Sequence, residues 1–71
     1  QNEVLRSLKG GVRDGYLHYG RGLRMKLYFE EDKWKPPSGT RIRLEKVRVG
    51  CFEYPEIAVE KPEQLRRLSD R

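Results

Sequence analysis

The sequence predicts a small, mainly β protein, folded as a barrel or a highly curved antiparallel sheet with short terminal helices. Residues 23–29 alternate strictly between apolar and polar side chains, which is the period of a half-buried strand. Two further stretches, 41–49 and 56–60, carry Ile, Leu and Val at strand spacing and are bounded by Gly or Pro turns. With 71 residues, 35% of them hydrophobic, the chain is expected to be one domain with a thin core (1–71), either whole or part of a longer protein.

The first predicted element is a short helix over residues 3–9. Val4, Leu5 and Leu8 fall on one face of it at helical spacing. The paired glycines at 10–11 then end the helix, because they disfavour its continuation and permit positive φ. A helix of two turns is stable only when it docks on the rest of the fold.

A β-hairpin is predicted next, with strands 12–19 and 23–29 joined by the glycine-rich turn 20–22. The alternation of the second strand sorts its side chains into two sets. The inward set is Leu23, Met25, Leu27 and Phe29, and the outward set is Arg24, Lys26 and Tyr28.

The following residues, 30–40, are predicted to form a loop, since Pro36 and Pro37 lack backbone donors. This loop carries the only Trp, and Trp34 has two interpretations. It could stack on a base or anchor a protein partner. Alternatively, it folds back to cap an open end of the barrel, which the thin core favours.

The strand 41–49 changes phase part-way. Ile42 and Leu44 share one face, whereas Val47 and Val49 share the opposite one. A β-bulge near residues 45–46 is expected to restore a common apolar face and to bend the strand as a small barrel requires. The outward set is then Arg41, Arg43, Lys46 and Arg48.

The chain is predicted to end with a turn (50–55), a short strand (56–60) and a closing helix from residue 62 to about residue 70. A proline suits the first helical position. Leu65 and Leu68 are about one helical turn apart and form its apolar side.

Charge is distributed in blocks. Sixteen Lys and Arg against 11 Asp and Glu give a net charge of +5 and a pI near 9.7. The basic residues concentrate in 6–28 and 41–48, and acidic residues lie between and after these blocks. If the two blocks lie side by side as strands, they form one positive face, which attracts a polyanion.

Several kinds of chemistry are not expected. The chain has one His and one Cys, His18 and Cys51, and Cys51 is interpreted as an inert buried thiol at a strand end. Zinc needs about four ligands at recognisable spacing, and no glycine loop suited to phosphates precedes a helix. We therefore expect no metal, no cofactor and no enzymatic activity. The lone thiol suits an intracellular, reducing compartment, and no apolar run approaches the roughly 20 residues that span a membrane.

Nucleic acid is the predicted partner. Basic side chains neutralise phosphates and aromatic rings stack on exposed bases, so a surface that mixes the two suits a single strand of DNA or RNA. The predicted site residues are Tyr16, Arg21, Arg24, Lys26, Tyr28, Trp34, Arg41, Arg43, Lys46 and Arg48. Two alternatives stay open. These residues could be ordinary solvent-facing strand residues, or the chain could be a domain for protein interaction or self-association through an exposed strand edge.

Residues 38–44 (Ser-Gly-Thr-Arg-Ile-Arg-Leu), followed by 47–49 and 57–59, resemble the last two strands of an oligonucleotide/oligosaccharide-binding (OB) fold of the replication-protein-A type. The resemblance implies a small barrel that binds single-stranded nucleic acid on its curved face, with Arg41, Arg43 and Arg48 as backbone contacts. An OB fold has five strands, whereas the sequence indicates four. The closing helix is instead similar to small SH3-like chromatin proteins, which are the second choice.

Overall fold

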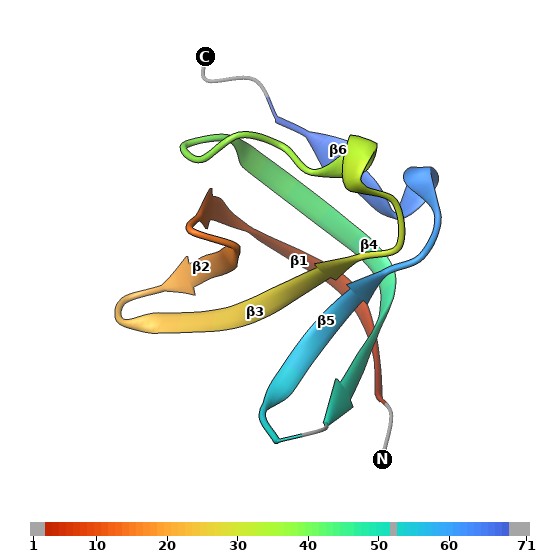
Figure 1. Cartoon of the computed structure of the whole chain (residues 1–71). Coiled ribbons are helices and arrows are strands. Elements are labelled where there is room, and N and C mark those ends of the chain that lie inside the picture. The colour runs from red at the N-terminus through yellow and green to blue at the C-terminus, as the bar shows by residue number, and fades with distance from the viewer. Residues whose placement is uncertain (1–2, 52, 69–71) are drawn as a thin grey trace.

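The computed structural model describes residues 3–51 and 53–68 and is mainly β, which confirms the predicted fold class (Figure 1). No α-helix occurs in these residues, and two single 3-10 turns, η1 and η2, interrupt the strands. The elements are β1 (Glu3–Arg13), β2 (Tyr16–Gly20), β3 (Leu23–Phe29), η1 (Asp32–Trp34), β4 (Arg41–Cys51), β5 (Pro55–Val59), η2 (Pro62–Gln64) and β6 (Leu65–Arg67).

Five of the strands close into a barrel. β1, β2 and β3 pair in sequence as antiparallel neighbours, and β4 returns to lie beside β1. This spatial order, β4-β1-β2-β3, is a Greek key. β5 lies between β4 and β3, antiparallel to the first and parallel to the second, and so completes the closure. The short β6 pairs with the first half of β4.

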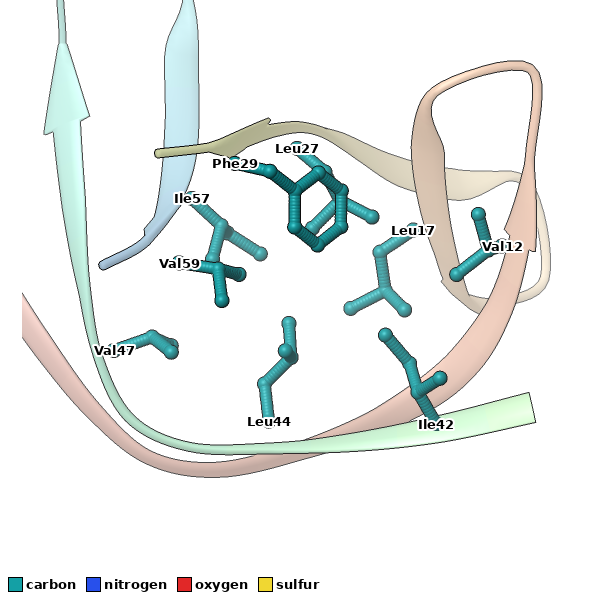
Figure 2. Packing of buried hydrophobic residues seen from close by; sticks show 9 residues of the cluster. All are labelled: Val12, Leu17, Leu27, Phe29, Ile42, Leu44, Val47, Ile57 and Val59. Carbon is teal, nitrogen blue, oxygen red and sulfur yellow. The ribbon is translucent and has the colours of Figure 1, made fainter. Parts of the chain in front are cut away.

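The core lies inside the barrel and draws on all five of its strands (Figure 2). The buried residues are Val12, Leu17, Leu27, Phe29, Ile42, Leu44, Val47, Ile57 and Val59. The inward assignment in β3 holds for Leu27 and Phe29, and Met25 is half-buried against the core. It is wrong for Leu23, which is 53% exposed. The reason is that β5 pairs with β3 only from Lys26 onward, so Leu23 lies on the part of β3 that extends beyond the closed barrel.

The predicted first helix is instead the N-terminal half of β1. The pairs on either side of Arg6 and Lys46 keep one constant register, and Arg6 and Lys46 themselves are missing from the ladder. Compared with regular strands, β1 and β4 therefore each contain one extra residue at the same place, and the inward and outward positions exchange beyond it. Leu5 and Leu8 both contact the core although they are three residues apart, so a kinked strand reproduces the spacing of a helix.

The same kink explains the phase change predicted in β4. Lys46 has a left-handed backbone with φ of 56°, and Val47 beyond it is fully buried. The irregularity lies where the bulge is predicted. Its form differs, because in a bulge two residues oppose one, whereas here the extra residue of β4 is matched by one in β1.

A second difference concerns the predicted strand 12–19. Asp14 and Gly15 have φ of 54° and 80°, the two positive values of a type I′ hairpin turn. This turn divides the stretch into the end of β1 and the start of β2, and it places Arg13 directly opposite Tyr16.

The predicted closing helix is reduced to the single turn η2, followed by β6. The Gln64 side chain holds this turn: its Oε1 accepts hydrogen bonds from the backbone N–H groups of Glu60 (2.8 Å) and Lys61 (2.9 Å). Its Nε2 donates to the carbonyl of Lys46 at 2.8 Å, which ties η2 to the kink in β4. Residues 69–70 of the predicted helix lie outside the described residues.

We expect Gln64→Ala to lower the free energy of unfolding by about 1–2 kcal/mol, because three hydrogen bonds are lost at a half-buried position. Gln64→Glu keeps the two acceptor contacts and loses the donor, so its loss should be smaller. Urea denaturation of the three proteins measures this. Equal stabilities of the Ala variant and the parent chain would show that Gln64 does not hold the turn.

Candidate nucleic-acid interface

On the outward face of β2 and β3, two cationic side chains lie over one aromatic ring. Arg24 and Lys26 are exposed, because the inward positions of β3 alternate with them. Tyr16 in β2 lies directly opposite Lys26. The Arg24 guanidinium lies over the Tyr16 ring at 4.7 Å from its centroid, and the Lys26 ammonium lies at 5.4 Å. Both distances are within the range of cation–π attraction, about 6 Å.

Beside this face is an open groove of about 1060 Å³, which we call the tyrosine groove. It lies between the β2–β3 hairpin and the connection from β4 to β5. Its lining residues are Tyr16, Tyr19, Arg24, Met25, Lys26, Glu53, Tyr54, Pro55 and Glu56. Tyr54 is 76% exposed. The groove therefore offers three aromatic rings, two cations and two carboxylates.

The charges of the tyrosine groove are arranged on two sides. The cations Arg24 and Lys26 belong to β3, whereas Glu53 and Glu56 belong to the β4–β5 connection and β5. Glu56 lies opposite Lys26 in the parallel pair β3–β5. Carboxylates repel phosphates, so a strand bound here would keep its phosphates near the cations of β3 and away from Glu53 and Glu56.

The two basic blocks lie side by side only where β1 pairs with β4, which places Lys9 directly opposite Arg43. Arg24 and Lys26 of β3 do not join them. β5 separates β3 from β4 on one side of the barrel, and β2 and β1 separate them on the other. Arg41 and Arg43 point outward from the first half of β4, Arg41 exposed and Arg43 half-buried. Lys46 lies further away, at the kink, beside a small cluster of Arg6, Glu45, Lys61 and Glu63.

Arg48 points outward but forms an ion pair with Glu60. The Arg48 Nε donates to Glu60 Oε1 at 3.2 Å, and a second guanidinium nitrogen donates to the other carboxylate oxygen. This hydrogen bonding lowers the pKa of Glu60, and the hydrogen bond and the charge of Glu60 raise the pKa of Arg48. The pair is therefore fully charged at neutral pH, and Glu60 already occupies the guanidinium that a phosphate would need.

The other predicted residues have varied positions. Trp34 is half-buried in η1 and packs against the core, as the capping interpretation expects. Tyr28 is 50% exposed on the outer face of β3, and Arg21 is exposed in the turn between β2 and β3. Cys51 is exposed, which contradicts its interpretation as a buried thiol.

The structure adds two residues that the sequence interpretation missed. Arg13 becomes a neighbour of Tyr16 through the Asp14–Gly15 turn, and that two-residue turn signal was present in the sequence. Tyr54, which is not among the predicted site residues, lines the tyrosine groove. Nothing in the local sequence distinguishes an exposed loop tyrosine from a packed one.

No family model matches the chain, and neither a curated protein nor a solved structure matches it significantly. Within 3–51 and 53–68, no helix is long and apolar enough to cross a membrane. The same residues hold no cluster of three or more His, Cys, Asp or Glu side chains suited to a metal ion.

Proposed function

We propose that this chain is a single-stranded nucleic-acid-binding module that uses the outer face of β2 and β3 together with the tyrosine groove. The observation that carries the proposal is the layered arrangement of Arg24 and Lys26 over the Tyr16 ring. Bases stack on aromatic rings and on guanidinium planes, and cations beside the ring neutralise the adjoining phosphates. A duplex keeps its bases stacked on each other, so this arrangement suits a single strand.

We also propose that the barrel is an OB fold rather than an SH3-like barrel. An OB fold is a five-stranded Greek-key barrel that binds oligonucleotides on the face of strands 2 and 3, with the loops between strands 1 and 2 and between strands 4 and 5. Here the order β4-β1-β2-β3 and the parallel pair β3–β5 support that assignment. The tyrosine groove lies between the β2–β3 face and the β4–β5 connection, where such a fold binds its ligand.

Within this proposal the groove residues have distinct roles. Tyr16 stacks on one base, and Arg24 and Lys26 contact its phosphates. Tyr54, exposed on the opposite wall, offers a second ring. Glu53 and Glu56 keep phosphates off that wall, which fixes the orientation of the strand across the groove.

The proposal is tested with a fluorescently labelled 12-nucleotide single strand, titrated at 50 and 200 mM salt. The two phosphate contacts of the groove alone give a slope of log K against log salt of about −1.4, so affinity should fall at least about sevenfold over this range. A duplex of the same sequence is the control and should bind more weakly. Absence of binding at 50 mM salt, or tighter binding of the duplex, would overturn the proposal.

A further inference from the structure

Three basic residues form a row across the outward surface of β1, β4 and β6, on a part of the barrel distinct from the tyrosine groove. Arg43 in β4 lies directly opposite Lys9 of β1 on one side and directly opposite Arg66 of β6 on the other. Lys9 and Arg66 are exposed and Arg43 is half-buried. Figure 1 shows β6 lying along β4 at the end of the barrel where β4 begins. We call Lys9, Arg43 and Arg66 the cation row.

The cation row is electrostatically unfavourable by itself. Like charges directly opposite each other on neighbouring strands destabilise a sheet. Within the described residues, none of the three forms an ion pair. Glu45 is the one carboxylate on the same outward face of β4, two positions along the strand from Arg43, and it lies opposite Ser7 rather than a member of the row. A ligand with repeated negative charges would remove this repulsion.

A line of outward positions connects the cation row with the tyrosine groove. Arg41 lies two residues before Arg43 on the same face of β4 and opposite Gly11 of β1. Gly11 in turn lies opposite His18, and His18 lies opposite Arg24. Adjacent strands are about 4.8 Å apart, so Arg41 and Arg24 are separated by three strand spacings, about 14 Å along the sheet. A Cβ atom added at Gly11 would meet no atom within 4 Å, so the surface between these residues is open.

From this arrangement we propose that a nucleic-acid strand held in the tyrosine groove continues across β2 and β1 and places its phosphates on the cation row. The row is thus a second binding site for the phosphodiester backbone, outside the groove. This inference rests on the proposed function and extends it, because it gives the strand a path around the barrel. It also makes affinity depend on strand length, since a short oligonucleotide fills the groove without reaching the row.

The experiment compares oligonucleotides of 4 and 12 nucleotides, which lie within the range of site sizes known for such folds, about 4 to 16. The variant is Lys9→Gln/Arg66→Gln, which removes two charges and leaves the half-buried Arg43 in place. The control variant Arg6→Gln/Lys61→Gln removes the same net charge from the cluster that also contains Glu45 and Glu63. The unfolding midpoint of each variant is measured first. We expect the row variant to have an unfolding midpoint equal to or above that of the parent chain, because the substitutions relieve the repulsion between like charges in the row.

For the 12-nucleotide strand, the row variant should bind about tenfold more weakly at 50 mM salt, and its salt slope should be smaller by about 1.4. For the 4-nucleotide strand, the row variant and the parent chain should bind alike. Equal losses in the row and control variants would overturn the inference while leaving the proposed function intact. Poly-glutamate is titrated against the same proteins. If the row variant loses poly-glutamate binding but binds the 12-nucleotide strand as the parent chain does, the inference is also overturned, because the row would then bind an acidic protein. No binding of either strand to the parent chain would instead refute the proposed function itself.

Discussion

Gly10→Ala is expected to lower the free energy of unfolding by about 3 kcal/mol, at the upper end of what overpacking costs. An added Cβ atom would lie 2.4 Å from the carbonyl oxygen of His18 and 3.0 Å from Leu17 Cδ1. The first of these is a backbone atom of the neighbouring strand, which cannot rotate away. At this point β2 joins the ladder of β1: Gly10 pairs only with β4, whereas Gly11 pairs with both β4 and β2. Relief of the clash would therefore require β1 and β2 to separate at the point where the barrel closes. A loss of this size is a large part of the stability of a small domain.

The matched control is Gly11→Ala. Neither glycine has a positive φ, so Ala reduces the conformational freedom of the unfolded chain equally in both variants. Because an added Cβ at Gly11 meets nothing within 4 Å, this variant should be neutral or more stable by up to about 1 kcal/mol. Urea denaturation with circular dichroism measures both. Similar stability of the two Ala variants would mean that the close approach of His18 does not require glycine at position 10.

The glycines also show what the sequence could predict and what it could not. Strand 23–29 was predicted with its observed boundaries, because strict alternation is a local signal that needs no knowledge of a partner. A short strand was likewise predicted at 56–60, and the structure buries Ile57 and Val59 in it. The role of Gly10 depends on β2 crossing close to it, which is a tertiary fact. The sequence therefore indicated only that a glycine pair interrupts a regular element.

The two predicted helices failed for related physical reasons. Leu5 and Leu8 are three residues apart because β1 and β4 are kinked at the same place, and a period measured along one chain cannot separate that kink from a helix. After Pro62 a helical turn does begin. It ends after one turn because Leu65 takes an extended backbone and pairs with Leu44 of β4, which begins β6.

The sequence predicted those features of the candidate site that depend on a single strand. It missed those that depend on how neighbouring strands pair. Arg24 and Lys26 follow from the alternation of β3. Their proximity to Tyr16, and the neighbours Lys9 and Arg66 of Arg43, exist only because of the pairing between strands. Similarly, no local pattern shows that Glu60 neutralises Arg48, twelve residues earlier in the chain.

Tyr16→Ala is expected to weaken binding of a single-stranded oligonucleotide by about 1–3 kcal/mol, or about 5- to 150-fold, the range that one stacked base contributes. The loss has two sources. The substitution removes the ring on which a base stacks, and it also removes the surface that holds Arg24 and Lys26 beside each other. Tyr16 is half-buried and outside the buried core, so the variant should remain folded. Fluorescence anisotropy at 50 mM salt measures the affinity, and circular dichroism checks the fold.

Tyr16→Phe separates stacking from hydrogen bonding by the hydroxyl group. Phenylalanine keeps the ring and its negative face, so it still attracts Arg24 and Lys26 and should bind within about twofold of the parent chain. Tyr28→Ala provides a second comparison, because Tyr28 lies on the same outer face of β3 and is 50% exposed but does not line the tyrosine groove. Its loss should be smaller than that of Tyr16→Ala. If Phe weakens binding as much as Ala does, the hydroxyl rather than the ring makes the contact. If neither Tyr16 variant weakens binding, the strand does not use this face, and the basic and aromatic residues of β2 and β3 are ordinary solvent-facing residues of a small barrel.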